Sequence, residues 1–207
     1  MVMTLHVAPR SGNSHRIEHF LNTLSLPYTA VMHDYTAGDL KSPAFLDKNP
    51  RGQVPVLEDD GHIVWDSIAI LAYLARKYGG ERWFPTDARG LAEVTQWLAL
   101  AGNEHLFGIA QVRIMRRYRN ANEPLVLTHL DRALALSARG LATMERRLAT
   151  HPWLAVDRPT IAEMACFTYP ALHREADIDL TPYPAVRGWL GRVRALPGFK
   201  SMPGLDD

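Results

Sequence analysis

The residue pattern of this chain changes character near residue 80. Residues 1–80 alternate short strand-like runs with helix-like runs, whereas residues 88–197 carry helical patterns almost throughout. Strands that alternate with helices predict an α/β layer, and consecutive amphipathic patterns predict packed helices. The length of 207 residues is enough for two small domains, so we expect domains over 1–80 and 88–207, joined by a linker over 81–87.

A strand, a helix and a second strand are expected at the start of the chain. The strands are Thr4–Val7 and Tyr28–Met32, and Ser14 is the expected N-cap of the helix between them. This order predicts a parallel strand pair with a right-handed crossover. The apolar face of the helix has the spacing i, i+3, i+4, i+7 and consists of Ile17, Phe20, Leu21 and Leu24.

The rest of the first half completes the order βαβαββα. A short helix near Pro43–Asp47 is followed by a hairpin of Val54–Glu58 and His62–Trp65. Asp66 can cap a third helix. The expected inward residues of that helix are Ile68, Leu71, Ala72 and Ala75.

Two long helical patterns begin the second half, over about 88–119 and about 124–150. Thr160 and Glu163 then form a capping box, in which each side chain accepts a hydrogen bond from the other residue's backbone N–H. A last helix is expected from about Pro184 to Leu196. The second domain is therefore expected to be all-helical.

Composition and charge exclude several classes of partner. The formal net charge is +1 and no run of about 20 apolar residues occurs, so we expect neither a nucleic-acid nor a membrane partner. The single cysteine, Cys166, excludes an internal disulfide and favours a reducing compartment, and we expect it to be buried. No His or Cys spacing typical of a metal site occurs. We interpret one basic cluster as a solvated helix face: Arg113, Arg116, Arg117 and Arg119.

Three segments resemble the cytosolic glutathione S-transferases, in the order that this family has them. LKSPAFLDKNPRGQVPVLED (40–59) is similar to the family's glutathione-site segment, DSIAILAYLARKY (66–78) to the helix that follows it, and DRPTIAEMAC (157–166) to its capping-box segment. The resemblance covers nearly the whole chain. It implies a thioredoxin-like N-terminal domain, an all-helical second domain, and a cytoplasmic, homodimeric detoxification enzyme that uses glutathione as co-substrate and no metal.

Within that family the chain looks like the serine type, meaning the theta- and phi-like classes and related bacterial members. Their S-x-N-x-x-R segment places its first serine at the glutathione sulfur, and here that segment runs from Ser11 to Arg16. The resemblance implies Ser11 as the catalytic residue with Asn13 in support, and Ser14 is the rival for the role. The loop contains no tyrosine or cysteine, which disfavours the tyrosine and cysteine types.

Pro55 stands inside a strand-like run, although proline lacks the N–H that a central strand needs. In the family this proline is cis, and the residue before it, here Val54, pairs its backbone with the cysteinyl part of glutathione. A carboxylate and a hydroxyl at a helix start suit the ligand's amino-acid end. The remaining residues that the resemblance implies are Asp66 and Ser67 for the γ-glutamyl end, and Gln53 and Lys41 for the glycine end.

The electrophile is expected between the domains, against the first long helix of the second half. Candidates by position are His105, Phe107, Gln111 and Met115, and their apolar members would suit an apolar electrophile. We expect a glutathione transferase that activates the glutathione thiol through Ser11. Two alternatives stay open: another glutathione-dependent enzyme, such as a peroxidase, dehalogenase or isomerase, and a non-catalytic protein that binds glutathione or an apolar ligand.

Overall fold

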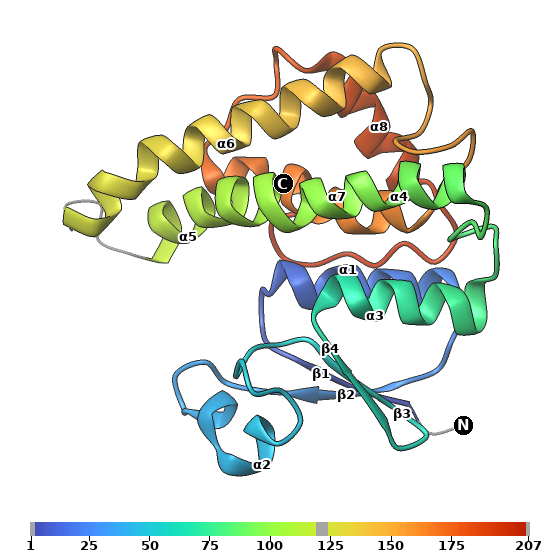
Figure 1. Cartoon of the computed structure of the whole chain (residues 1–207). Coiled ribbons are helices and arrows are strands. Elements are labelled where there is room, and N and C mark those ends of the chain that lie inside the picture. The colour runs from blue at the N-terminus through green and yellow to red at the C-terminus, as the bar shows by residue number, and fades with distance from the viewer. Residues whose placement is uncertain (1–2, 119–123, 206–207) are drawn as a thin grey trace.

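The computed structural model describes residues 3–118 and 124–205. A four-stranded sheet lies at one end of the molecule, two helices cover one of its faces, and the helices of the second half of the chain stack on that pair (Figure 1). The predicted class, an α/β domain followed by an all-helical domain, is confirmed. The exact boundaries of 1–80, 81–87 and 88–207 stay a prediction.

The sheet has the strand order β2-β1-β3-β4. Strand β1 (Met3–Val7) pairs in parallel with β2 (Thr29–Met32), as the strand–helix–strand order predicts. Strand β3 (Val56–Asp59) is antiparallel to β1 and to β4 (His62–Trp65), with which it forms the predicted hairpin. The chain start and the hairpin therefore meet in the middle of the sheet.

Helices α1 (Gly12–Thr23) and α3 (Ser67–Leu74) cover one face of the sheet. Their apolar side chains pack against β1 and β3, which removes them from water and stabilises this layer. The expected inward face of α3 is corrected in part: Ile68 and Ala72 are half-buried at the margin of the core. The fully buried residues of α3 and the turn after it are Ile70, Leu71, Leu74 and Ala75.

A second, smaller apolar cluster is separate from this core. It involves α2 (Pro43–Leu46), which Ser42 caps, and the turn η1 (Asp39–Lys41) just before it. Because the cluster also includes residues from the ends of β1 and β3, it fixes the loop after β1 beside the residues that precede β3. Its members are Ala8, Leu40, Phe45, Val54 and Val56.

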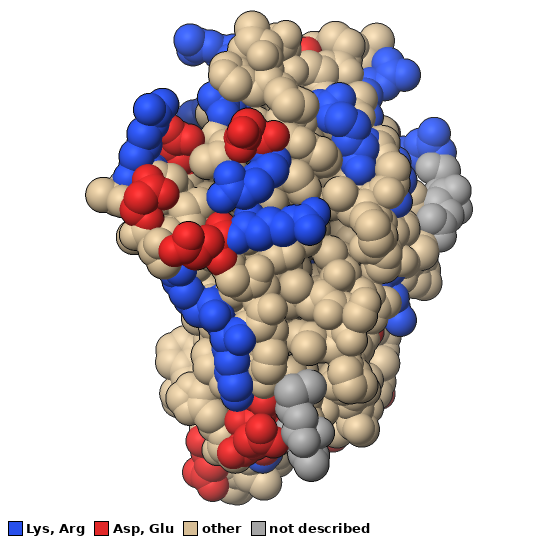
Figure 2. Space-filling view, turned by 90° about the vertical axis from the view of Figure 1, so that its right-hand side faces the viewer, with Lys and Arg blue, Asp and Glu red and all other residues tan. Residues whose placement is uncertain are grey.

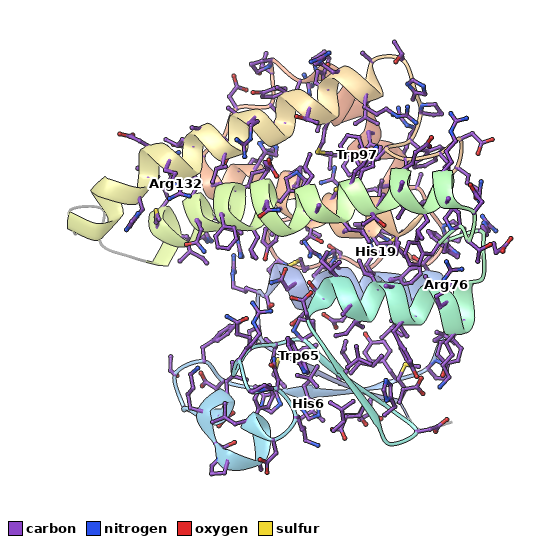
Figure 3. All side chains as sticks on the ribbon, viewed as in Figure 1. His6, His19, Trp65, Arg76, Trp97 and Arg132 are labelled. Carbon is purple, nitrogen blue, oxygen red and sulfur yellow. The ribbon has the colours of Figure 1, made fainter. Side chains whose placement is uncertain are left out.

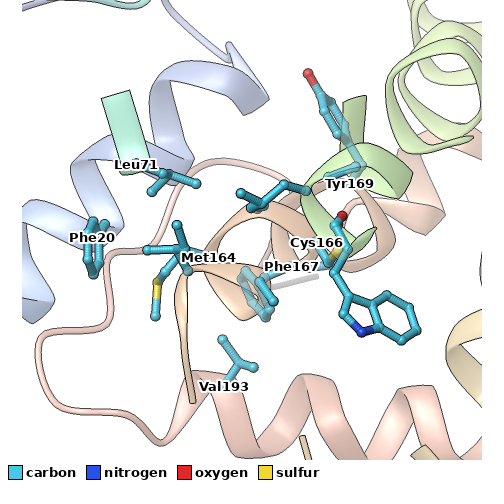
Figure 4. Packing of buried hydrophobic residues seen from close by; sticks show 14 of the residues in the cluster. Phe20, Leu71, Met164, Cys166, Phe167, Tyr169 and Val193 are labelled. Carbon is cyan, nitrogen blue, oxygen red and sulfur yellow. Dashed lines mark hydrogen bonds between the residues drawn. The ribbon is translucent and has the colours of Figure 1, made fainter. Parts of the chain in front are cut away.

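The second half of the chain forms a helical stack around α7. All eleven residues of α7 are buried, and its side chains meet α1 and α3 on one side and α8 on the other (Figure 4). In Figure 3, His19 lies between the two halves and Trp97 lies within the stack. The π-helical turn η2 (Ala75–Gly79) directly follows α3 in the first half. The elements of the second half are α4 (Ala88–Leu100), the π-helical segment η3 (Ala101–Ile109), α5 (Ala110–Tyr118), α6 (Pro124–Leu148), α7 (Ile161–Ala171), η4 (His173–Ala176) and α8 (Pro184–Arg194).

The predicted capping box at the start of α7 is confirmed. Glu163 is fully buried, and its Oε2 accepts hydrogen bonds from the Thr160 backbone N–H at 2.7 Å and from the Thr160 hydroxyl at 3.0 Å. Its Oε1 accepts from the Leu154 N–H at 2.8 Å, so the same carboxylate also fixes the preceding loop. Cys166 lies within two helical turns of the capping box and is buried, as expected. Burial raises the pKa of its thiol.

Charges are mixed on the face of the molecule that Figure 2 shows, with Lys and Arg side chains beside Asp and Glu. This agrees with the net charge of +1. Within residues 3–118 and 124–205, no helix is long and apolar enough to cross a membrane. The same ranges contain no group of three His, Cys, Asp or Glu side chains that could hold a metal ion.

Candidate functional site

Ser11 is the N-cap of α1. Its backbone is extended (φ −75°, ψ 113°), and its Oγ accepts a hydrogen bond from the Ser14 N–H at 3.2 Å. The prediction that Ser14 caps this helix is therefore wrong. Ser14 already lies in the first helical turn, whereas an N-cap needs the extended backbone that Ser11 has. The Ser14 side chain is buried, and its Oγ has no partner among the described residues.

This geometry leaves Ser11 with a hydrogen to donate. Because its Oγ acts as acceptor for Ser14, the hydroxyl hydrogen can point away from the helix, toward the partly exposed side of the residue. The N–H groups of Gly12 and Asn13 begin the helix, so they have no acceptor one turn earlier within it. The helix dipole adds positive potential at the same place, and the arrangement suits an anion.

The N-terminal end of α1 is tied to the helical domain through Tyr169 of α7. The Tyr169 hydroxyl donates to Asn13 Oδ1 at 3.2 Å. A Cβ at Gly12 would come within 2.7 Å of the Tyr169 ring, so only glycine permits this approach. Arg113 of α5 donates to the carbonyl of Arg10 at 3.2 Å, just before Ser11. The loop that carries Ser11 is therefore held from the second domain.

Val54 lies beside that same loop, because it shares the small apolar cluster with Ala8. The Val54–Pro55 peptide bond is cis, which confirms the expectation. Gln53 comes just before it, and its carbonyl accepts from the buried Asn49 side chain at 2.7 Å. The structure thus brings the V-P segment next to the start of α1.

Lys41 ends the turn η1 and is exposed. The loop of residues 49–53 packs closely against it: Gly52 has a φ of +60°, and a Cβ there would lie 2.7 Å from Lys41 Nζ and from the Leu40 carbonyl oxygen. Gly52 is thus required both by its backbone conformation and by this close approach. Lys41 therefore lies close to Gly52, the residue just before Gln53.

Asp66 caps α3, as predicted. Its Oδ1 accepts from the Ile68 N–H at 2.8 Å, and its Oδ2 accepts from Arg51 Nη1 at 2.9 Å. Ser67, the first residue of the helix, is nearly buried, and its Oγ accepts from Arg16 Nη1 at 3.0 Å. The hydroxyl hydrogen of Ser67 is therefore available to a ligand, as that of Ser11 is.

Arg16 joins the two serine-bearing helix starts, and sequence reasoning gave it no role. Its side chain is 2% exposed, its guanidinium lies over the Tyr169 ring at 5.6 Å, and burial lowers its pKa. Its Nε and Nη2 have no hydrogen-bond partner in the described part of the chain. A signal for its burial existed: Arg16 precedes Phe20 by four residues and therefore shares the predicted inward face of α1.

The four residues expected at the electrophile site do not converge on one surface. His105 is fully buried, and burial lowers its pKa to about 3. Phe107 is 55% exposed, Met115 is buried, and Gln111 is half-buried. Their role stays a prediction, and this structure gives His105 no surface on which a ligand could rest.

The basic cluster of α5 is not a uniformly solvated face, which corrects our interpretation. Arg113 is buried, and its Nε lies 2.5 Å from the buried carboxylate of Glu175, which also pairs with Arg10 and Arg117. The sequence hides this pairing, because Glu175 lies 62 positions from Arg113. Of the other members, Arg116 pairs with Asp177, and Arg119 lies outside the described residues.

Comparison with known proteins connects this geometry to a family. The glutathione S-transferase N-terminal domain model matches residues 1–76, and the C-terminal domain model matches residues 105–197. The chain is 29% identical to the Escherichia coli protein named disulfide-bond oxidoreductase YfcG, over 95% of this chain and 92% of that protein. It is 33% identical to glutathione S-transferase D7 of Anopheles gambiae, over 76% of this chain and 70% of that protein.

A solved structure agrees with these matches. The glutathione S-transferase from Xanthobacter autotrophicus Py2 superimposes with a TM-score of 0.90 at 34% sequence identity, covering 99% of this chain and 98% of that one. The two family models together span more than half of the chain, and they do so in the order of its two domains. The chain therefore belongs to the glutathione S-transferase family.

Proposed function

We propose that the protein is a glutathione transferase of the serine type, in which Ser11 stabilises the thiolate of bound glutathione. The observation that carries the proposal is the position of Ser11 as N-cap of α1, where its Oγ accepts from the Ser14 N–H and its hydroxyl hydrogen is left to donate beside the helix start. Family membership supports glutathione as the ligand. The V-P segment at Val54 shares an apolar cluster with Ala8 of the loop before α1, and the start of α3 is joined to α1 by the hydrogen bond from Arg16 to Ser67.

The ligand would lie along the first domain with its three parts on three groups of residues. The cysteinyl part pairs with the backbone of Val54, the γ-glutamyl end meets Asp66 and Ser67, and the glycine end meets Lys41 and Gln53. Asn13 supports the Ser11 loop through Tyr169 rather than through the ligand. In this proposal the sulfur would lie at the helix start, where Ser11 could donate to it.

The chemistry needs a thiolate. A free thiol has a pKa of about 8.5, and lowering it by about two units takes roughly 2.7 kcal/mol of preferential thiolate stabilisation. A charge-assisted hydrogen bond from Ser11, together with the dipole of α1, is of the right size for this. The thiolate then attacks an electrophile that approaches from the second domain, and a sulfur–carbon bond forms. In a substitution the leaving group departs with its electron pair. In an addition to an activated double bond, the product takes up a proton.

The test combines binding with turnover. Calorimetric titration with glutathione, followed by rates with a panel of apolar electrophiles and hydroperoxides, compares wild type with Ser11→Ala and Ser14→Ala. We expect glutathione to bind wild type, and we expect Ser11→Ala to lower the conjugation rate much more than Ser14→Ala does. A wild type that binds no glutathione contradicts the proposal.

A second candidate function is glutathione-dependent reduction of disulfides, which the name of the Escherichia coli relative favours. Cys166 is the single cysteine of the chain and is buried with a raised thiol pKa, so the protein itself cannot supply the attacking thiolate. Bound glutathione would attack the disulfide, which forms a mixed disulfide and releases one thiol. A second glutathione would then attack the mixed disulfide, which gives oxidised glutathione and releases the other thiol. A small aromatic disulfide added to the same panel tests this.

We also propose a homodimer, as is usual in the family. Large apolar side chains on β4 and along the η3–α5 helix are exposed in the single chain, which favours a covered surface there. Light scattering on the purified protein checks this expectation, and a monomer at micromolar concentration contradicts it. The side chains concerned are Ile63, Trp65, Phe107 and Ile114.

A further inference from the structure

The carboxylate expected to receive the ligand's ammonium group is already occupied. Asp66 Oδ1 is used by the Ile68 N–H at 2.8 Å, and Asp66 Oδ2 is held by Arg51 Nη1 at 2.9 Å. An ammonium group that approaches Oδ2 therefore meets a guanidinium at the same oxygen. A ligand with a positive charge alone would have to displace Arg51 or share the oxygen with it, at a cost in affinity.

Hydrogen bonds within its own loop hold Arg51 in position. Its backbone N–H donates to the side-chain oxygen of buried Asn49 at 3.0 Å, and the Asn49 amide donates to the Gln53 carbonyl. The Arg51 guanidinium lies over the Trp65 ring at 5.9 Å, and Figure 3 shows Trp65 where β4 passes into α3. The loop next to the V-P segment thus delivers a cation to the start of α3.

The ion pair is open to a ligand. The side chains of Arg51 and Asp66 are 46% and 39% exposed, and ion pairs at such sites contribute only about 0–1 kcal/mol. Its partners can therefore be exchanged at low cost. The γ-glutamyl end of glutathione carries an ammonium and a carboxylate on one carbon atom, so its two charges are as close together as those of the pair.

On the basis of the proposed function, we propose that Arg51 and Asp66 form a clamp for a zwitterionic amino-acid end. Asp66 receives the ammonium, and Arg51 turns from Asp66 to the carboxylate, for which its planar fork is suited. The Ser67 hydroxyl, whose oxygen is held by Arg16, donates to the same carboxylate. Arg51 is then a specificity-determining residue that favours thiols carrying a free α-amino-acid end.

The charges of site and ligand agree with this assignment. Glutathione has two carboxylates and one ammonium, and beside the buried Arg16 the site offers two exposed cations, Arg51 and Lys41, and one carboxylate, Asp66. Without Arg51, the ligand's α-carboxylate would have only neutral donors in the clamp, namely the Ser67 hydroxyl and the backbone N–H groups at the start of α3. Lys41 lies at the other end of the loop, against Gly52, where it can serve the glycine carboxylate.

Calorimetry with three ligands tests the clamp. The ligands are glutathione, cysteinylglycine, which lacks the whole γ-glutamyl group, and γ-aminobutyryl-cysteinylglycine, which keeps the ammonium but lacks the α-carboxylate. The proteins are wild type, Arg51→Gln, Arg51→Lys and the control Arg89→Gln. Arg89 is the control because it is an exposed arginine in a surface ion pair, with Glu93, in the first turns of α4.

We expect Arg51→Gln to weaken glutathione binding about 10- to 100-fold, the range for a hydrogen bond to a charged group, and Arg51→Lys to weaken it less. Cysteinylglycine should bind wild type and Arg51→Gln equally. The aminobutyryl ligand should bind Arg51→Gln more tightly than wild type, because its ammonium no longer competes with a guanidinium. Arg89→Gln should match wild type with all three ligands.

The clamp is overturned if Arg51→Gln binds glutathione as tightly as wild type, or if it loses the same factor with all three ligands. The second result would mean that the substitution disturbs the loop as a whole. These failures differ from failure of the proposed function, in which wild type itself binds no glutathione and the clamp has no ligand.

Discussion

Acid should destabilise this protein through three buried histidines. His15, His19 and His105 have almost no exposed surface, and burial lowers their pKa values from 6.5 to about 4, about 3 and about 3. In the neutral ring His15 Nε2 donates to the Lys200 carbonyl at 2.7 Å, and Nδ1 accepts from the Thr168 hydroxyl at 2.9 Å. Both nitrogens of His105 lack a hydrogen-bond partner among the described residues.

The direction of the pH effect follows from linkage. The folded pKa values lie below the unfolded value, so the unfolded chain takes up protons that the folded chain does not. Stability is therefore fully present above about pH 6.5 and falls as the pH drops toward about 4. Midway in that window the three rings together hold nearly three more protons in the unfolded state, so their own contribution to the slope is about 4 kcal/mol per pH unit. A typical stability of about 5–15 kcal/mol would then be lost within a few pH units.

Urea denaturation at a series of pH values in this window measures the slope. We compare wild type with His105→Met, which removes one buried titrating ring and keeps a side chain of similar volume. The contribution of the three rings to the slope should fall by about one third, or about 1.4 kcal/mol per pH unit. His129→Gln is the matched control, because His129 is exposed on α6. An unchanged slope for His105→Met would refute the reasoning that this ring is held neutral by burial.

Three further predictions concern buried contacts within the helical domain and between the two domains. Glu163→Ala leaves the Leu154 and Thr160 N–H groups without their acceptor, so we expect a loss of at least about 3 kcal/mol in urea denaturation, against about 1 kcal/mol for a simple N-cap loss. Gly12→Ala should lower the melting temperature, because its Cβ meets the Tyr169 ring at 2.7 Å, whereas Gly102→Ala, whose Cβ meets nothing within 4 Å, should not. Cys166 should react with a thiol reagent only at the rate of unfolding, and fast labelling of the native protein would contradict its burial.

Local patterns predicted most of the fold. The apolar spacing of Ile17, Phe20 and Leu21 placed α1, and the strand–helix–strand order predicted the parallel pair of β1 and β2. The capping box at the start of α7 could be predicted because its two residues are only three positions apart in the sequence. Such features depend on contacts within one turn or between adjacent elements, and these are the contacts that a single sequence records.

Long-range pairings could not be predicted in the same way. Nothing near Asp66 in the sequence indicates that Arg51 holds its second oxygen, and nothing near Arg113 indicates that Glu175 neutralises it. The prediction of the α1 N-cap was wrong for another reason. Ser11 and Ser14 are both good cap residues, and only the backbone conformation decides between them. The residue types of the candidate site were therefore readable, whereas their partners were not.

The central claim is that Ser11 stabilises the thiolate of bound glutathione, and the pKa of that thiol tests it most directly. The ultraviolet absorbance of the thiolate, followed against pH in the complex with saturating glutathione, gives the value for wild type, Ser11→Ala and the control Ser14→Ala. We expect a pKa well below the free-thiol value of about 8.5 in wild type and in Ser14→Ala, and a return toward that value in Ser11→Ala. Equal thiol pKa values in wild type and Ser11→Ala would contradict the account.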